Sequence, residues 1–257
     1  MTVYETRNPL RRRPPWGAFA LLLWLCLGCI AAARPEADPT TVARSYWTAM
    51  GKGEFDAAYK LLSKEWQKDV TKSMFATFAR THSSYQRPAD RFGPATLRKT
   101  RALVPFKLVT RACHACLVKE AGGWRLANID AEMPASWIEN PSADQVAATA
   151  AVNAYSVSRF ARNYAEAYKW LSPATRQAMS LRDYESRAGL PPGAGGYMKQ
   201  LCAPFVQGQT AQVFGFTIAW AKKGGPRMLV FGMAPLEKVG GKWWVSIPPR
   251  HSPAGGG

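Results

Sequence analysis

The sequence predicts an α+β fold in which one small unit, helices followed by an antiparallel sheet, occurs twice in tandem. Three observations predict it. A block of sequence recurs 109 residues further along the chain, apolar residues early in each copy recur at helical spacing, and apolar residues late in each copy alternate. A basic, apolar leader precedes the first copy.

The leader occupies residues 1–33 and is typical of a signal peptide or membrane anchor. Its apolar part, residues 17–33, reads GAFALLLWLCLGCIAAA without a charge and follows the three arginines 11–13. Arginines ahead of an apolar run hold that end of a chain in the cytoplasm, so we expect the residues after Arg34 to be exported. The sequence therefore predicts a bacterial-type envelope protein.

Three fates of this leader remain open. Residues 31–33, all alanine, suit signal-peptidase cleavage before Arg34. The segment 27–29, Leu-Gly-Cys, resembles the end of a lipobox, which makes Cys29 a candidate for lipidation as in a lipoprotein, although Cys26 stands where leucine is usual. Seventeen apolar residues also suffice for a short retained membrane span. The expected location is the periplasmic face of the inner membrane, with the chain anchored, lipidated or soluble in the periplasm.

The repeat is clearest around the second predicted helix. Residues 55–63, FDAAYKLLS, align with residues 164–172, YAEAYKWLS, and five of the nine are identical. Further along, KEAGGW at 119–124 meets EKVGG at 237–241, where the offset between the copies is 118. The longer offset predicts an insertion in the second copy, which we place in the glycine- and proline-rich residues 189–196.

Each copy predicts the same order of elements. An amphipathic helix comes first, a second follows a short break, and a third begins after a serine or threonine. The period then changes to two, and a Gly-Gly turn leads into a return strand. The expected helices are 40–50, 54–62 and one after Thr71, then 144–159, 163–171 and one after Ser180. The expected strand regions are 102–118 and 124–129, then 211–220, 227–236 and 243–247. The predicted domains are 38–132 and 144–250, with a linker over 133–143.

This layout resembles a known superfamily. A second helix reading GEFDAAYKLLS, a third helix and a sheet ending in GGWRL are similar to the NTF2-like (cystatin-related) cone domains. The resemblance covers most of 40–130 and again 147–248, and it implies two tandem cones with curved antiparallel sheets. It implies little about activity, because the superfamily includes isomerases, dehydratases, ligand binders and scaffolds. Its extracytoplasmic members include the VirB8-like components of secretion systems, which generally have one such domain rather than two.

The motif Cys113-His114-Ala115-Cys116 could indicate a redox pair, a metal site or a disulfide. The repeat places it in a strand, where residues three apart are separated by roughly 10 Å. A disulfide needs Cα atoms within about 7 Å. We therefore expect packed strand residues and no metal site. A disulfide from Cys113 or Cys116 to Cys202 is the main alternative, with redox or metal chemistry less favoured.

The residue patterns do not favour an enzyme. An acid–base site needs an acidic residue and a donor that converge, whereas most carboxylates here fall at helix ends or on polar helix faces, and Asp130 ends a strand. The sequence has no Ser-His-Asp, HExxH, Walker or dinucleotide-binding pattern. We expect no catalytic residue and no cofactor.

Aromatic and basic residues indicate possible contacts. Trp124, Trp243 and Trp244 are the candidates for an interaction surface, and because Trp243 and Trp244 are adjacent in a strand, one of them should face outward. The net charge of +17 favours an anionic lipid surface as a partner, although a solvated basic surface explains it equally. No dense run of lysine and arginine after residue 34 predicts a specific nucleic-acid site.

These observations together favour a non-enzymatic interaction or scaffold protein of the cell envelope, with other envelope proteins as partners and an open oligomeric state. An assembly or adaptor role at the inner membrane, within a secretion or other membrane complex, is one expected setting. The alternative is a periplasmic protein that binds a small molecule or lipid in the pocket of one cone.

Overall fold

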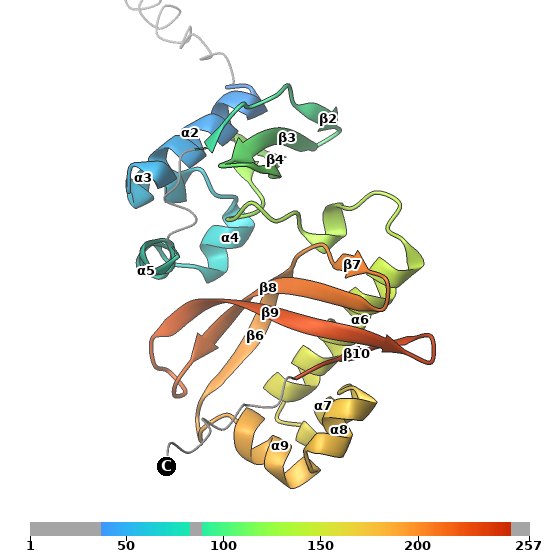
Figure 1. The fold of residues 1–257 in the computed structure, drawn as a ribbon. Coiled ribbons are helices and arrows are strands. Elements are labelled where there is room, and N and C mark those ends of the chain that lie inside the picture. Colours follow the sequence, from blue (N-terminus) through green and yellow to red (C-terminus); the bar gives the residue numbers. More distant parts are fainter. Residues whose placement is uncertain (1–36, 83–88, 248–257) are drawn as a thin grey trace, which may run out of the picture. The chain divides into compact units, whose positions relative to one another are not determined.

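The computed structural model describes residues 37–82 and 89–247 (Figure 1). The leader, with Cys29 and its possible fates, lies outside the described residues. The described residues show the predicted α+β class, with two copies of one unit in which helices precede an antiparallel sheet. No helix in the described ranges is long and apolar enough to cross a bilayer.

The first copy begins with α2, whose N-terminus is capped by the Asp38 carboxylate through the backbone N–H groups of Thr40 (2.9 Å) and Thr41 (3.1 Å). Its helices are α2 (Pro39–Gly51), α3 (Phe55–Lys60), α4 (Lys64–Asp69) and α5 (Lys72–Thr81). Its strands are β1 (Ala89–Asp90), β2 (Thr96–Arg98), β3 (Arg101–Leu108), β4 (Arg111–Glu120) and β5 (Gly123–Leu126). The strand order is β1-β3-β4-β5, with β2 also paired to β3.

The second copy follows the short 3₁₀ helix η2 (Ala135–Trp137). Its helices are α6 (Ala143–Phe160), α7 (Tyr164–Lys169), α8 (Pro173–Ala178) and α9 (Leu181–Ala188). Its strands are β6 (Gly195–Leu201), β7 (Phe205–Gln207), β8 (Thr210–Trp220), β9 (Arg227–Val239) and β10 (Lys242–Val245). The order is β10-β9-β8-β6, with β7 also paired to β8.

The repeat extends to individual hydrogen bonds. The Tyr59 hydroxyl donates to Val70 O (2.8 Å), and the Tyr168 hydroxyl, 109 residues later, donates to Met179 O (2.7 Å). The end of the second helix is bridged to the last strand in both copies, at Leu62 with Leu126 and at Leu171 with Val245. The aligned blocks therefore form the same contacts twice.

Each copy contains a short helix that the sequence patterns did not predict. The predicted second helices, 54–62 and 163–171, end directly before Ser63 and Ser172. In the structure their hydroxyls accept hydrogen bonds from Trp66 N (3.4 Å) and Thr175 N (3.1 Å), so they begin α4 and α8. A serine at the N-cap favours the start of a helix. Pro173 occupies the first position of α8, where a proline is tolerated.

Three expectations about the strands were wrong. The alternating stretch 102–118 is two strands joined by a tight turn at Val109. Val109 has a positive φ of 61°, which valine rarely adopts, and no glycine there indicates a turn. The insertion is not at 189–196, because β2 and β3 still match β7 and β8 at the offset of 109. It lies in the β8–β9 hairpin, where Thr217 pairs with Val230 while Leu108 pairs with Arg111 in the first copy. The offset late in the copies is 119, because Lys119 pairs with Trp124 while Lys238 pairs with Trp243.

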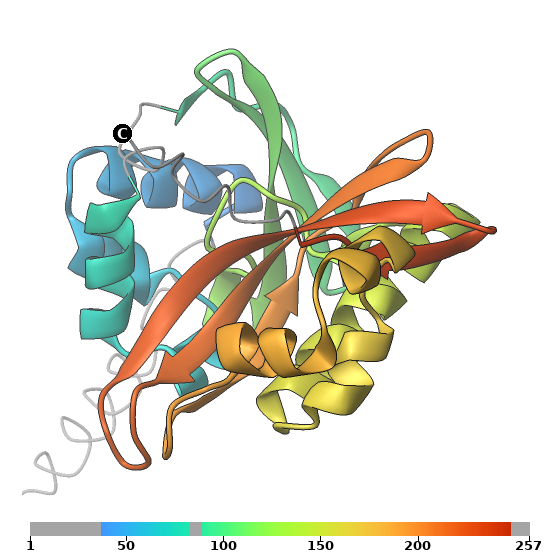
Figure 2. The same ribbon diagram turned by 60° about the horizontal axis from the view of Figure 1, so that its bottom comes forward.

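The sheet of the second copy serves two cores (Figure 2). Successive residues of a strand point to opposite faces. Ala211 and Val213 of β8 pack into the core beneath α6, whereas Phe216 and Ile218 belong to the core of the first copy. The Phe216 ring centroid lies 5.6 Å from that of Trp66 and 5.6 Å from that of Phe78. The first copy therefore completes its core with side chains of the second.

Candidate functional site

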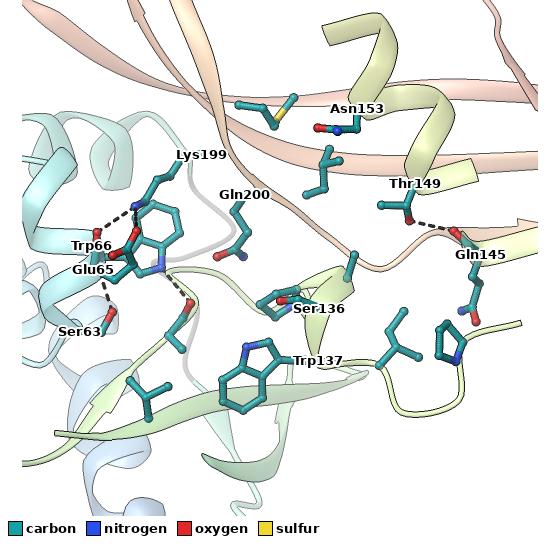
Figure 3. Close-up of a pocket in the computed structure, with 18 of the residues that line it drawn as sticks. Ser63, Glu65, Trp66, Ser136, Trp137, Gln145, Thr149, Asn153, Lys199 and Gln200 are labelled. Atoms are coloured by element: carbon teal, nitrogen blue, oxygen red, sulfur yellow. Dashed lines mark hydrogen bonds and ion pairs between the residues drawn. The ribbon is translucent and has the colours of Figure 1, made fainter. Parts of the chain in front are cut away.

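A cleft of about 780 Å³ lies between the two copies (Figure 3). The interior of the first copy is filled by large buried side chains such as Trp47 and Phe75, and this cleft is at the junction, outside that interior. The cleft is lined by α4, the end of β4, the linker, α6 and β6, through Trp66, Val118, Trp137, Ile138, Val146, Ala150, Asn153, Met198, Gln200 and Leu201 among others.

The linker forms one wall of the cleft. Met133 O accepts a hydrogen bond from Ala203 N (2.7 Å), which holds the linker against the end of β6. The guanidinium of Arg101 lies 4.8 Å from the Trp137 ring, a cation–π contact that fixes this indole. Trp137 lines the cleft from the linker, with Gln200 on the wall above it in Figure 3.

One face of α6 forms the opposite wall. Val146, Ala150, Asn153 and Val157 recur at the spacing of a single helix face, and all four are exposed. Val146 is 53% exposed and Val157 58%, unusual values for valine on a helix that also packs into a core. The first three line the cleft, and Val157 extends the same face beyond it. This helix face is available for apolar contact.

The charges at the α4 end of the cleft are paired. Lys199 Nζ donates to Glu65 Oε1 (2.9 Å) and Asp69 Oδ2 (2.7 Å) and lies 5.7 Å from the Trp66 ring. Burial alone would lower the pKa of Lys199, but the bonds to Asp69 and Glu65 outweigh it and raise that pKa. The hydrogen bond from Lys199 lowers the pKa of Asp69. The lysine is therefore a fixed, neutralised part of the wall.

Glu120 and Gln200 are further polar side chains of the cleft lining. Glu120, the other carboxylate in this lining, accepts a hydrogen bond from Lys64 N (2.9 Å). In the described part of the chain no group of side chains could hold a metal ion. The Nε2 atom of the Gln200 amide is buried at the wall, without a hydrogen-bonded oxygen or nitrogen among the described residues. An apolar segment with an occasional hydrogen-bond acceptor fits this lining.

Asp130 lies deep at the junction rather than at an exposed strand end. It is 1% exposed, and Oδ1 accepts a hydrogen bond from Glu132 N (3.1 Å). Its Oδ2 has no hydrogen-bond partner among the described residues. Burial, followed by the nearby charge of Glu132, raises the pKa of Asp130 well above its usual range. The sequence pattern around Asp130 does not indicate its burial, because only the packing of the 128–132 segment buries it.

The three cysteines of the described residues are free and buried. Cys113 and Cys116 lie in β4 as expected. Cys113 is buried with Ala115 and Leu117 on one face of the strand, and Cys116 is buried on the other face. Burial raises the pKa of all three thiols. No disulfide to Cys202 is present in the structure, and these thiols are poor nucleophiles in the fold.

We expect Cys113, Cys116 and Cys202 to resist N-ethylmaleimide in the folded protein and to react fully once urea unfolds it. Peptide mass mapping without a reductant reads each site separately, so the leader thiols Cys26 and Cys29 do not interfere. A residue that stays unlabelled in urea but reacts after reduction would instead identify a disulfide.

Only one of the three tryptophan candidates is available to a partner. Trp124 and Trp243 are 7% and 1% exposed and occupy equivalent core positions, and the Trp243 indole donates to Asp144 Oδ1 (2.9 Å). Trp244 is the outward member of the pair. Its ring lies 4.2 Å from Lys242 Nζ and 5.3 Å from the Arg176 guanidinium, so it forms part of a basic aromatic surface.

Comparison with known proteins leaves the chain unassigned. No family model matches it, and no curated protein matches it. Among solved structures it is similar to an "Ntf2 like protein involved in plasmid conjugation", with 8% identity and a TM-score of 0.28 over 79% of this chain and 90% of that one. That description belongs to the other protein and assigns no role here.

Proposed function

We propose that the chain is a non-enzymatic interaction component of the cell envelope, and that the cleft between its two copies holds an apolar segment of another envelope protein. The observation that carries this proposal is the cleft itself. Both copies and the linker supply its walls, its charges are already paired, and an exposed apolar face of α6 continues beyond it.

The expected setting is the periplasmic face of the inner membrane, where the leader would deliver the chain. An assembly or adaptor role in a secretion or other membrane complex, beside VirB8-like components, is the finer form of the proposal. The charge of +17 and the basic surface around Trp244 would add contact with anionic lipid.

A photoreactive amino acid at Val146 tests the cleft in living cells, because this side chain is exposed within the lining. We expect an adduct with an exported or membrane protein. Ala150→Arg, on the same helix face, should abolish the adduct by placing a charge in the apolar wall. Ala147→Arg is the matched control, since Ala147 is exposed on the same helix but does not line the cleft.

The pattern across the two arginine variants decides the outcome. An adduct that Ala150→Arg removes and Ala147→Arg keeps supports the proposal. An adduct that forms in both variants contradicts it. So does the absence of an adduct at Val146 when the same photoreactive amino acid gives adducts at another exposed position, such as Val109. Val109 is 51% exposed and lies outside the cleft lining.

The second candidate is a protein that binds a small amphipathic molecule or lipid in the same cleft. The volume of about 780 Å³ favours it, because small-molecule sites commonly measure roughly 300–1,000 Å³. Lauric acid and a lysophospholipid are suitable probes. A rise in melting temperature that Ala150→Arg removes and Ala147→Arg preserves would favour this candidate, and no shift with either probe would count against it.

A further inference from the structure

Strand β9 carries an edge that no described strand pairs along most of its length. β8 pairs with β9 from Arg227 to Glu237 on one side. On the other side β10 reaches only Leu236 to Val239, and Ser246 N adds one bond to Pro235 O (2.8 Å). Figures 1 and 2 show β10 beside one end of β9 only.

The register identifies which backbone groups face the open edge. Pro235 O points toward β10, while Lys238 N bonds to Gln209 O on the β8 side (2.8 Å). In an antiparallel strand, alternate residues direct their N–H and C=O groups to the same edge. The N–H and C=O groups of Leu229, Phe231 and Met233 therefore all face the open edge.

The first copy covers one end of the equivalent edge. At the offset of 119, Pro235 corresponds to Cys116 and Met233 to His114. There the Asn128 amide accepts from Cys116 N (2.9 Å) and donates to His114 O (3.2 Å). The residue of the second copy at that position is Ile247, whose side chain forms no hydrogen bond. The counterpart of Met233 O is therefore bonded by a side chain in the first copy, and the second copy lacks that side chain.

The exposed stretch also lacks the usual protection of an edge strand. Residues 228–234, Met-Leu-Val-Phe-Gly-Met-Ala, contain no charge and no proline, and three apolar side chains there are exposed: Met228 (51%), Val230 (43%) and Met233 (50%). Proteins normally block such an edge with a charge, a proline or a bulge, because it pairs readily with another strand.

We propose that β9 pairs edge to edge with β9 of a second copy of this chain, antiparallel and centred on Phe231. In that register Leu229 pairs with the partner's Met233 and each Phe231 pairs with the other, so all six open backbone groups of each chain are bonded. A pairing of this kind is isologous and closes as a dimer. The dimer axis then passes between the two β9 strands, which join the two sheets into one continuous sheet.

The proposed register keeps the basic ends of the two strands apart. The basic turn before β9, with Lys222, Lys223 and Arg227, lies at one end of the strand. In the antiparallel dimer each Arg227 is opposite the partner's Pro235, and the two arginines are separated by roughly 26 Å along the strand. The chain's own last residues offer a poorer occupant, because Pro248 and Pro249, directly after Ile247, have no N–H to donate.

Cross-linking of the full chain in mild detergent tests the register. Val230 and the partner's Gly232 become a directly opposed, non-hydrogen-bonded pair with Cα atoms about 4.5 Å apart, within the reach of a disulfide. A Cβ at Gly232 meets no atom within 4 Å, so the substitution is tolerated. A mixture of the Val230→Cys and Gly232→Cys chains, oxidised with copper phenanthroline, should yield the 230–232 linked peptide.

The matched control is a mixture of Val230→Cys with Met228→Cys, which this register keeps roughly 13 Å apart. We expect roughly tenfold less linked peptide there. Met233→Lys, a charge at the exposed edge, should also remove the dimer in sedimentation velocity, while Met233→Ala should keep it. Raising the salt concentration should strengthen the dimer, because screening reduces repulsion between chains of charge +17.

Equal linking in the two mixtures would overturn the proposal. So would a monomer at every protein and salt concentration, which would mean that the chain's own tail or a different protein covers β9. A dimer that Met233→Lys leaves intact would place the interface elsewhere and would overturn it as well.

Discussion

Replacing Phe216 with alanine should destabilise the whole described fold by about 3–5 kcal/mol, the usual cost of truncating a buried phenylalanine. Phe216 is fully buried, at 0% exposure, although it comes from the second copy and packs against Trp66 and Phe78 of the first. Because the core is shared, the loss should not be confined to the copy that carries the substitution.

Urea unfolding measures the free energy, and hydrogen exchange measured separately on peptides from α2 and α9 shows which copy opens. We expect one unfolding transition and a loss of protection in both peptides. Phe205→Ala is the control, since Phe205 is 57% exposed in the same copy and should change stability by less than about 0.5 kcal/mol. Two separate transitions, with α2 unaffected by Phe216→Ala, would contradict a shared core.

Replacing Asp130 with asparagine should stabilise the protein at neutral pH. The folded state raises the pKa of this carboxyl well above the 3.8 of an unfolded chain. Below pH 3.8 the carboxyl is protonated in both states and carries no penalty. As the pH rises above that value the unfolded state ionises first, so stability falls by about 1.4 kcal/mol per pH unit until the folded pKa is reached.

Asparagine cannot ionise and can keep the contact to Glu132 N, so the variant should match the wild type near pH 3.5 and exceed it increasingly toward pH 8. Melting temperature against pH measures this difference. Asp56→Asn is the control. Asp56 is exposed, and its pKa is lowered, chiefly by the hydrogen bond from Lys72, so its removal should slightly destabilise the protein at neutral pH. A constant difference for Asp130→Asn at all pH values would contradict the buried-carboxyl explanation.

The repeat made most of the fold predictable from sequence. Identical residues in the second helix of each copy correctly placed Tyr59 and Tyr168 in equivalent positions, and the alternating strands located both sheets. The errors occurred where one residue type serves two roles. Ser63 and Ser172 can close a turn or cap a helix, and the Gly-Gly pairs aligned by identity although their turns differ by one position.

The candidate site was less predictable, because it depends on how the two copies pack. Nothing in the alternation of β8 indicates that Phe216 faces another copy while Val213 faces its own helices. Likewise, Asp130 is unremarkable in sequence, and only the coverage of β4 by residues 128–132 buries it. The signal that could have been used is the run Val146, Ala150, Asn153 and Val157, an apolar face on a helix that already has a buried one.

The shared core also affects the newly made chain. Residues of α2 to α5 leave the ribosome long before Phe216, Ile218 and Leu229, which belong to the same core. Domains generally fold as units during synthesis, once the residues that complete them have been made. The first copy therefore lacks part of its interior until most of the chain exists. For a chain proposed to be exported, this delay would keep the N-terminal half unfolded and able to pass through a translocation channel. Folding would then be completed on the far side of the membrane.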